Sequence, residues 1–124
     1  NENEISRIVV DCALNIHKEL GPGLLESVYE LLLTHELESC GLKVARQVPV
    51  KISYKGICFD KALELLLVED KVILELKSVE STSKAHKKQV LTYLKLTGLK
   101  LGLLLNFGEA LMKDGITRLI NGQL

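Results

Sequence analysis

The sequence predicts a single α+β domain, in which helices cover a sheet of short strands. Its 124 residues suit one domain, and a hydrophobic share of 47% is enough to form a buried core. Apolar residues recur at three- and four-residue steps in some stretches, as in helices, and form alternating or continuous runs in others, as in strands. No linker and no internal repeat separates these stretches, so we expect one domain over residues 1–124.

The ends of the predicted elements follow from turn and capping residues. Gly21-Pro22-Gly23 ends the first helix and Gly41 ends the second, while Ser81-Thr82-Ser83 offers N-caps for the third. Pro49 places the first strand at a sheet edge or at a bend. In chain order we expect helices with apolar stripes over residues 5–16 and 24–40, strands over residues 44–54, 57–59, 65–68 and 72–76, a helix that runs to about Leu96, and strands over residues 101–106 and 116–120.

Composition excludes several classes of protein. The apolar fraction rules out a disordered chain, and no apolar run approaches the roughly 18 residues that a membrane span needs. Cys12, Cys40 and Cys58 are odd in number and form no CxxC pair, so we expect free thiols of a reducing compartment that serve as small core residues. We therefore expect a soluble cytoplasmic domain without a membrane partner.

The charges are balanced in number but unevenly distributed. The net charge of zero argues against binding of nucleic acid by bulk charge alone. Residues 1–40 nevertheless carry eight acids and two bases, whereas residues 71–100 carry seven lysines and two acids. This asymmetry fits a basic face that meets a polyanion, and it fits equally a lysine-decorated helix and strand edge that keep the protein soluble.

Glu75-Leu76-Lys77 is the segment most suited to chemistry. In a strand, Glu75 and Lys77 project from the same face while Leu76 faces the other way. The carboxylate could hold a divalent cation, the Leu76 carbonyl could add an oxygen ligand, and Lys77 could orient or deprotonate a water or stabilise charge on a phosphate. The alternative is a strand end at which two charges simply emerge into solvent.

Polar residues on two predicted helices could join this segment. His86, Gln89 and Tyr93 share one face of the third helix, and a glutamine on a core-facing side usually bonds something specific. A solvated surface position is the alternative for His86. Glu26 lies in the first turn of the second helix, where it could equally complement the helix dipole.

Residues 23–29, Gly-Leu-Leu-Glu-Ser-Val-Tyr, resemble the signature of the GxxExxY protein family, which is placed in the PD-(D/E)XK nuclease superfamily. The resemblance covers nearly the whole chain, from Ile5 to about Ile120. It implies a restriction-endonuclease-like αβββαβ core, with a mixed central sheet flanked by helices, and a magnesium (or manganese) site. In that site Glu26, Glu75, Lys77 and Gln89 take the roles of the helix glutamate, the ExK pair and the helix glutamine. Further matching segments are His17–Gly23, Arg46-Gln47-Val48-Pro49, residues 67–73, Glu75-Leu76-Lys77, Gln89 with Tyr93-Leu94, and residues 105–108.

The chain departs from the family at one position. The family has an aspartate ten residues before the ExK glutamate, where this chain has Leu65, and the nearest acid is Glu64. A slip of one residue along a strand turns the side chain to the opposite face. A two-residue hairpin loop would place Glu64 opposite Glu75, whereas a three-residue loop would place Leu65 there. We expect the three-residue register and a weakened site, unless a bulge near residues 63–65 reorients Glu64.

These residues favour a magnesium-dependent nuclease that hydrolyses DNA. Glu64, Glu75 and the Leu76 carbonyl are the expected metal ligands, with Glu26 as the alternative acid, while Lys77 positions the attacking water and Gln89 orients the lysine or the phosphate. The expected nucleic-acid contacts are Lys84, His86, Lys87, Lys88 and Tyr93. Two alternatives stay open: a nuclease-fold module without catalysis, which binds nucleic acid or assembles, and a protein-interaction domain, which the 26 leucines would suit. A homodimer is compatible with the nuclease and with the interaction domain, and we expect one.

Overall fold

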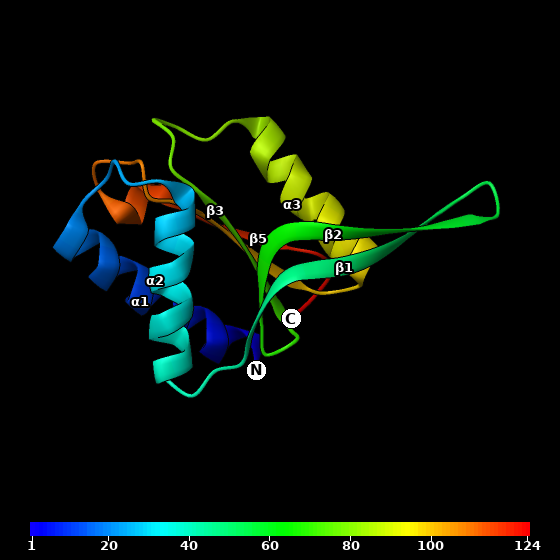
Figure 1. The fold of residues 1–124 in the computed structure, drawn as a ribbon, viewed down its shortest axis with the longest axis horizontal. Coiled ribbons are helices and arrows are strands. Elements are labelled where there is room, and N and C mark those ends of the chain that lie inside the picture. The colour runs from blue at the N-terminus through cyan, green and yellow to red at the C-terminus, as the bar shows by residue number, and fades with distance from the viewer.

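The computed structural model describes residues 1–124, which form two helices, three strands, a third helix and two more strands (Figure 1). Local sequence explains the helix ends. Asn1 accepts a hydrogen bond from the Glu4 amide at the start of α1, Ser83 and His86 form a capping box at the start of α3, and Gly98 ends α3 with a left-handed φ of 74°. The elements are α1 (Glu2–Leu20), α2 (Glu26–Ser39), β1 (Val44–Tyr54), β2 (Ile57–Val68), β3 (Val72–Lys77), α3 (Lys84–Thr97), β4 (Leu101–Asn106), the short 3-10 helix η1 (Met112–Gly115) and β5 (Ile116–Ile120).

The five strands form one mixed sheet in the order β1-β2-β3-β4-β5. Neighbouring strands are antiparallel except β3 and β4, which are parallel and are connected through α3. Parallel neighbours require such a crossover, and it places α3 on one face of the sheet. The result confirms the predicted α+β class with an αβββαβ core and a mixed sheet flanked by helices.

Two apolar clusters hold the layers together, because successive residues of a strand face opposite sides of the sheet. On one side, β2, β3 and β4 pack against α1 and α2, with Leu66 and Leu74 among the buried residues. α3 covers the other side (Figure 1). There Leu65 and Ile73 pack with Val90 and Leu94 of α3. The central strands β3 and β4 are therefore buried almost throughout.

Some sequence expectations need correction. Residues 57–59 and 65–68 are not separate strands, because β2 runs without interruption beside β1, which pairs with it almost throughout. Of the three thiols expected in the core, only Cys12 is buried, and burial raises its pKa to about 12; Cys40 and Cys58 are exposed. They fall outside the core because Cys40 follows the last turn of α2 and Cys58 lies in the part of β2 that extends beyond the body. All three are free thiols, as expected, and Pro49 lies in edge strand β1.

The hairpin between β2 and β3 has the three-residue register. Val68 pairs with Val72 and Leu66 with Leu74, and this ladder contains no further pair beyond Leu74. Between β1 and β2 the register shifts: Arg46 pairs with Leu66, but Val48 pairs with Leu63. Two residues of β2 therefore oppose one residue of β1, which is a β-bulge at residues 64–65. No helix of the structure is long and apolar enough to cross a membrane.

Candidate active site at the fork between β2 and β3

β2 and β3 separate just where the ExK segment begins. Glu75 and Lys77 keep their parallel partners on β4, Leu104 and Asn106, but neither has a partner on β2. β2 instead continues beside β1, away from β3 (Figure 1). The divergence leaves a fork in the sheet, and the end of β3 lines one side of it.

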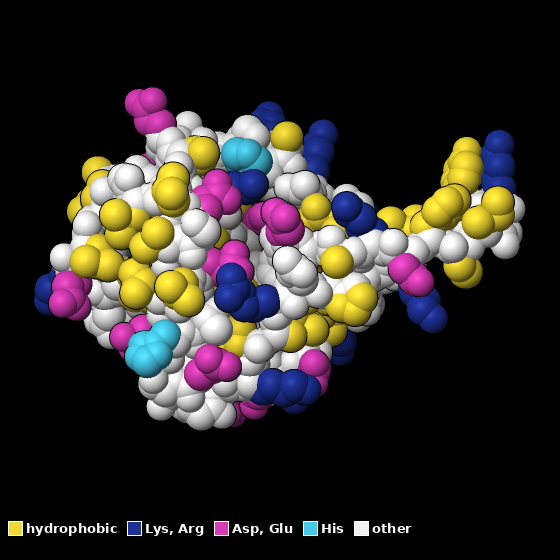
Figure 2. Space-filling model, in the orientation of Figure 1, with side chains coloured by type: hydrophobic (Ala, Val, Ile, Leu, Met, Phe, Trp, Pro, Cys, Tyr) yellow, Lys and Arg dark blue, Asp and Glu magenta, His cyan; other side chains and the backbone are white.

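An open cavity of about 370 Å³ lies at this fork. It combines side chains from α2, β2, β3 and α3, and acidic and basic groups surround the hollow at the centre of the face in Figure 2. The cavity contains six of the residues that the sequence singled out, together with Lys61, Ala62 and Leu63, which it did not. The six are Glu26, Glu64, Glu75, Lys77, Gln89 and Tyr93.

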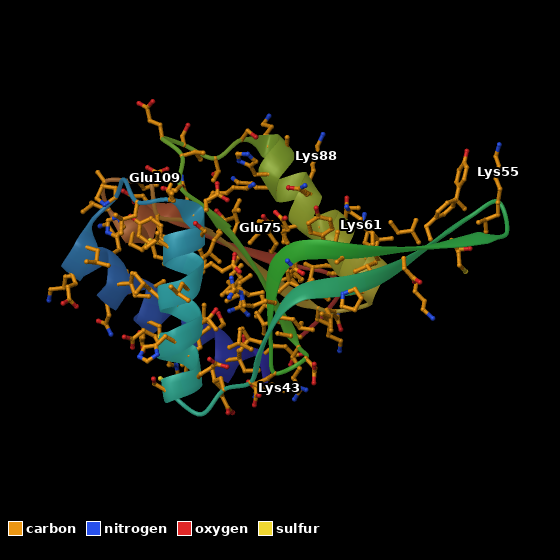
Figure 3. The ribbon with its side chains drawn as sticks, viewed as in Figure 1. Lys43, Lys55, Lys61, Glu75, Lys88 and Glu109 are labelled. Carbon is orange, nitrogen blue, oxygen red and sulfur yellow. The ribbon has the colours of Figure 1, made fainter.

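Glu75 and Lys77 form the inner part of the cavity. Glu75 Oε1 lies 3.7 Å from Lys77 Nζ, and only 10% of the Glu75 side chain and 21% of the Lys77 side chain are exposed. Figure 3 shows Glu75 near the centre of the molecule, between α2 and α3. The two side chains are adjacent because alternate residues of a strand share a face, as the sequence predicted.

The Glu75 carboxylate is buried, and the nearby acids outnumber the nearby bases. Burial raises the pKa of Glu75 above its ordinary value, and the charges of Glu26 and Glu30 add to the rise, whereas the Lys77 ammonium opposes it. A cation placed beside this carboxylate would lower its pKa again, because it stabilises the charged form. The cavity is therefore electrostatically suited to an additional positive charge.

Leu65 and Glu64 occupy different surroundings. Leu65 is 4% exposed and packs with Ile73 and Val90 in the cluster under α3, so an apolar side chain fills the position at which the resemblance implied an aspartate. Glu64 is exposed and lines the cavity together with Glu75 and Lys77. A bulge changes the direction of the side chains within it, and the bulge at residues 64–65 accounts for an acid on the cavity wall despite the three-residue register.

α2 contributes a pair of acids one helical turn apart. Glu26 is the first residue of α2, and Glu30 follows four residues later, a spacing that brings both to the same side of the helix. Glu30 accepts a hydrogen bond from Arg46 Nε at 2.9 Å, so its charge is partly balanced by a base of β1. Sequence reasoning missed Glu30, although its four-residue spacing from Glu26 could have indicated it.

α3 supplies only some of its predicted residues to the cavity. Gln89 and Tyr93 line it; burial and the charge of Glu75 raise the pKa of the Tyr93 phenol, and a hydrogen bond with Gln89 opposes the rise. His86 accepts a hydrogen bond from the Ser83 amide at 3.1 Å through Nδ1, so its ring caps the helix. The other predicted contacts of α3 are exposed and lie outside the cavity: Lys84, Lys87 and Lys88.

The Leu76 carbonyl faces the open side of the fork. Successive carbonyls of an extended strand point to opposite edges. The Lys77 carbonyl accepts a hydrogen bond from the Phe107 amide at 2.8 Å, on the β4 side, so the carbonyl of Leu76 points toward the side that β2 has left. An oxygen ligand is thus available between Glu75 and Lys77, as the sequence suggested.

A buried aromatic pair fixes the segment that leads into α2. The rings of Tyr29 and Phe107 stack with centroids 4.3 Å apart. The Tyr29 hydroxyl donates to the Gly21 carbonyl and accepts from the Leu24 amide at 3.2 Å. These bonds give the tyrosine of the GxxExxY pattern a structural role, because they hold the turn that precedes Glu26.

Ser78 and Asn106 connect that turn to the end of β3. Ser78 Oγ donates to the Leu24 carbonyl at 2.6 Å. Asn106, which is completely buried, accepts hydrogen bonds through Oδ1 from the amides of Val79 and Gly108 at 3.1 and 3.0 Å. Neither residue was predicted as part of the site, and only the fold brings them next to it. Together they fix the end of β3 relative to the start of α2.

The arrangement can present carboxylate and carbonyl oxygens, one ammonium group and one amide to a ligand in the cavity. No three Asp, Glu, His or Cys side chains of residues 1–124 lie close enough to hold a metal ion by themselves. A divalent cation would therefore be shared between fewer carboxylates, a backbone carbonyl and water, which Mg²⁺ tolerates because it usually keeps several waters.

A mixed sheet that opens at an acidic strand end, with an ExK pair and a helix glutamate, defines the class of nuclease-like α+β domains. The sequence model of the PD-(D/E)XK nuclease superfamily matches residues 3–119, and the chain belongs to this superfamily. Neither the curated proteins nor the solved structures include a match to the chain.

Proposed function

We propose that this protein is a nuclease of the GxxExxY branch, which hydrolyses phosphodiester bonds of DNA with Mg²⁺ or Mn²⁺. The observation that carries the proposal is the cavity at the β2–β3 fork, which combines Glu75 and Lys77 with Glu26 and Glu64. A buried carboxylate, an adjacent ammonium group and additional acids are the groups that phosphodiester hydrolysis requires.

The donor set fits a hard divalent cation, although it lacks one ligand of the family. Glu75, Glu64 and the Leu76 carbonyl would hold the ion, with Glu26 as an additional acid, and the raised pKa of Glu75 is evidence of a place where positive charge is favourable. When bound, such an ion would polarise a phosphoryl oxygen and lower the pKa of a coordinated water. Leu65 removes one carboxylate from this set, so affinity for the metal should be weak.

Lys77 is the residue that we assign to the attacking water. Only 21% of its side chain is exposed, and its ammonium group lies 3.7 Å from Glu75 Oε1. In that position it can orient a water or a phosphate oxygen and can stabilise the negative charge that develops on the phosphate.

The opposite wall and the surface of α3 have supporting roles in this proposal. Gln89, which lines the cavity beside Tyr93, can donate its amide to a phosphate oxygen or to the water. Lys84, Lys87 and Lys88 are exposed on α3 and can bind backbone phosphates beyond the reacting group. Such contacts do not depend on sequence, so the proposal includes no base specificity.

A nuclease fold without catalysis is the second candidate, because Leu65 replaces the family's aspartate and no trio of acidic side chains is preformed. Such a module would retain DNA at low salt without any requirement for metal. The homodimer expected from the sequence stays a prediction, which sedimentation equilibrium of the purified protein would test.

The deciding experiment measures cleavage of plasmid and branched DNA with Mg²⁺, with Mn²⁺ and with EDTA. Lys77→Met and Glu75→Gln should each lower the rate by about 100-fold or more. Matched controls are Lys100→Met and Glu38→Gln, which change an exposed lysine and an exposed glutamate outside the cavity. Absence of metal-dependent cleavage by the wild type, or equal rates for the site variants and their controls, would refute the nuclease. DNA retention that is indifferent to EDTA would then support the inactive module.

A further inference from the structure

The β1–β2 hairpin extends as an arm beyond the rest of the molecule. We define this arm as residues 51–62, with Lys55-Gly56 at its tip, and it is the long ribbon that projects from the body in Figures 1 and 2. Every residue from 53 to 62 is exposed. An isolated two-stranded ribbon is only marginally stable in water. We therefore expect the arm to bind a partner.

One face of the outer part of the arm is apolar, from the Ile52–Phe59 pair to the tip. Residues that pair across an antiparallel ribbon share a face, and Ile52 pairs with Phe59 while Tyr54 pairs with Ile57. This face continues from Val50, which is buried under α3. The exposed fractions of its outer members remain large, at 61% for Tyr54, 58% for Ile57 and 51% for Phe59.

The arm carries every aromatic ring that the core and the cavity do not use. The chain has five aromatic residues. Tyr29 and Phe107 stack on one another in the core, and Tyr93 lines the cavity. The remaining two, Tyr54 and Phe59, are exposed on the same face of the arm, in cross-strand pairs that are two residues apart along the ribbon. That spacing corresponds to about 7 Å, or roughly twice the 3.4 Å rise of a stacked nucleic-acid strand.

The arm is also positively charged and begins at the cavity. It carries Lys51, Lys55 and Lys61 against the single acid Asp60, in a chain whose net charge is zero. Lys55 lies 5.4 Å from the centre of the Tyr54 ring, so a cation accompanies the aromatic group at the tip. Lys61 lines the cavity itself, whereas Figure 3 shows Lys55 at the far end of the arm. A nucleic-acid strand with one phosphate in the cavity could therefore continue along the arm.

We propose that the arm binds unpaired nucleotides next to the phosphate held in the cavity, with bases stacked on Tyr54 and Phe59 and phosphates near Lys55 and Lys61. Alternation of aromatic rings and cations is the chemistry that recognises single-stranded nucleic acid, because every base has a face that can stack. Lysines without aromatic rings would suit a duplex backbone, and apolar residues without lysines would suit a protein. The inference rests on the proposed nuclease function and names its substrate as a strand with an unpaired segment.

The test compares variants that remove stacking but keep apolar surface. Tyr54→Leu with Phe59→Leu eliminates both rings, and Leu111→Ala, an exposed apolar residue elsewhere, is the matched control. Fluorescence anisotropy with EDTA measures the affinity for three labelled probes: a short single-stranded oligonucleotide, an abasic oligonucleotide of the same length, and a blunt duplex. Circular dichroism melts check that both variants remain folded.

The double variant should weaken binding of the single strand by about tenfold or more. Its affinity for the abasic strand and for the duplex should stay within about twofold of the wild type. An unchanged affinity for the single strand would overturn the proposal, as would an equal loss for the abasic probe or the duplex, which would make the arm a backbone contact. A change from dimer to monomer in sedimentation equilibrium, without loss of single-strand affinity, would assign the arm to self-association and would also overturn it.

Hydrolysis of bis(p-nitrophenyl) phosphate with Mn²⁺ separates this inference from the proposed function. This small diester has no bases and does not reach the arm, so the arm variant should hydrolyse it at the rate of the wild type, whereas Lys77→Met should not hydrolyse it. Absence of hydrolysis and of DNA cleavage by the wild type would refute the nuclease. The binding measurement does not depend on hydrolysis, so it would still test the arm in that case.

Discussion

Replacing Leu65 by aspartate should restore the missing carboxylate and make the fold dependent on metal. Leu65 is 4% exposed and packs with Ile73, Val90 and Leu94. Removing its buried side chain costs about 2–3 kcal/mol, and an unpaired buried acid costs about 1–3 kcal/mol more. Without metal, Leu65→Asp should therefore lower the free energy of unfolding by about 4 kcal/mol and the Tm by roughly 15 °C.

A divalent ion should reverse much of this loss, because Leu65 adjoins Leu66, the partner of Leu74, and the new carboxylate would therefore lie next to the part of β3 that carries Glu75. An ion present at 100 times its Kd stabilises the folded state by about 2.7 kcal/mol, which corresponds to roughly 10 °C in Tm. The wild type lacks this ligand and should gain less from the same concentration of ion. Thermal melts by circular dichroism, in EDTA and in Mn²⁺, measure both differences.

Leu67→Asp is the matched control for this experiment. Leu67 also lies on β2, packs partly against the same cluster and pairs with Ile73, away from Glu75. Its replacement should destabilise the protein without any recovery in Mn²⁺. The reasoning would be refuted if Leu65→Asp and Leu67→Asp responded equally to the ion, or if the wild type gained as much as Leu65→Asp.

Four further predictions concern the cavity and its supports. Protonation of Glu75 competes with binding of Mn²⁺, and burial raises the pKa of this carboxyl. When the pH is lowered, the Mn²⁺ affinity measured by calorimetry should therefore begin to fall at a higher pH than an ordinary glutamate would give. A fall confined to the pH range of an ordinary glutamate would contradict this prediction. Lys77→Met removes the charge that lowers that pKa, so the fall should move to still higher pH, while Lys100→Met leaves it unchanged. Glu75→Gln should increase the free energy of unfolding of the metal-free protein at neutral pH. A carboxyl whose pKa is raised in the folded state stabilises the fold at low pH, and this stability is lost as the pH rises through that pKa. Urea titrations measure the difference in free energy of unfolding between variant and wild type, and an equal difference at low and at neutral pH would contradict the prediction. Tyr29→Phe should lower the free energy of unfolding by about 1–3 kcal/mol, because two backbone groups of the turn before Glu26 lose their partner, and equal stability in urea would exclude that role.

Local patterns were enough to predict most elements of the fold. The apolar stripes, the glycine stops and Ser83 predicted the three helices, and alternation placed Glu75 and Lys77 on one face of β3. The three-residue register of the β2–β3 hairpin was expected as well, whereas a bulge near residues 63–65 was named only as the exception that would reorient Glu64. These features depend on residues close in sequence, so periodicity and turn chemistry are sufficient to indicate them.

Features that depend on distant segments were missed or wrong. Lys61 reaches the cavity only because the part of β2 that precedes Leu66 is not paired with β3 and diverges from it toward the arm. The network of Ser78 and Asn106 joins residues 27 and more positions apart, and no local pattern predicts it. Cys40 and Cys58 were expected in the core because cysteine is usually buried, but Cys40 follows the last turn of α2 and Cys58 lies in the exposed part of β2.

By itself, the sequence determined the α+β class, the order of the helices and the segment that carries Glu75 and Lys77. Only the tertiary structure decided that Leu65 fills the core while Glu64 lines the cavity, and that an aromatic, basic arm begins there. The physical reason is that side-chain alternation is a local property of each strand. The direction in which β2 leaves the sheet, by contrast, depends on its bulge opposite Gln47 and on the packing of both faces.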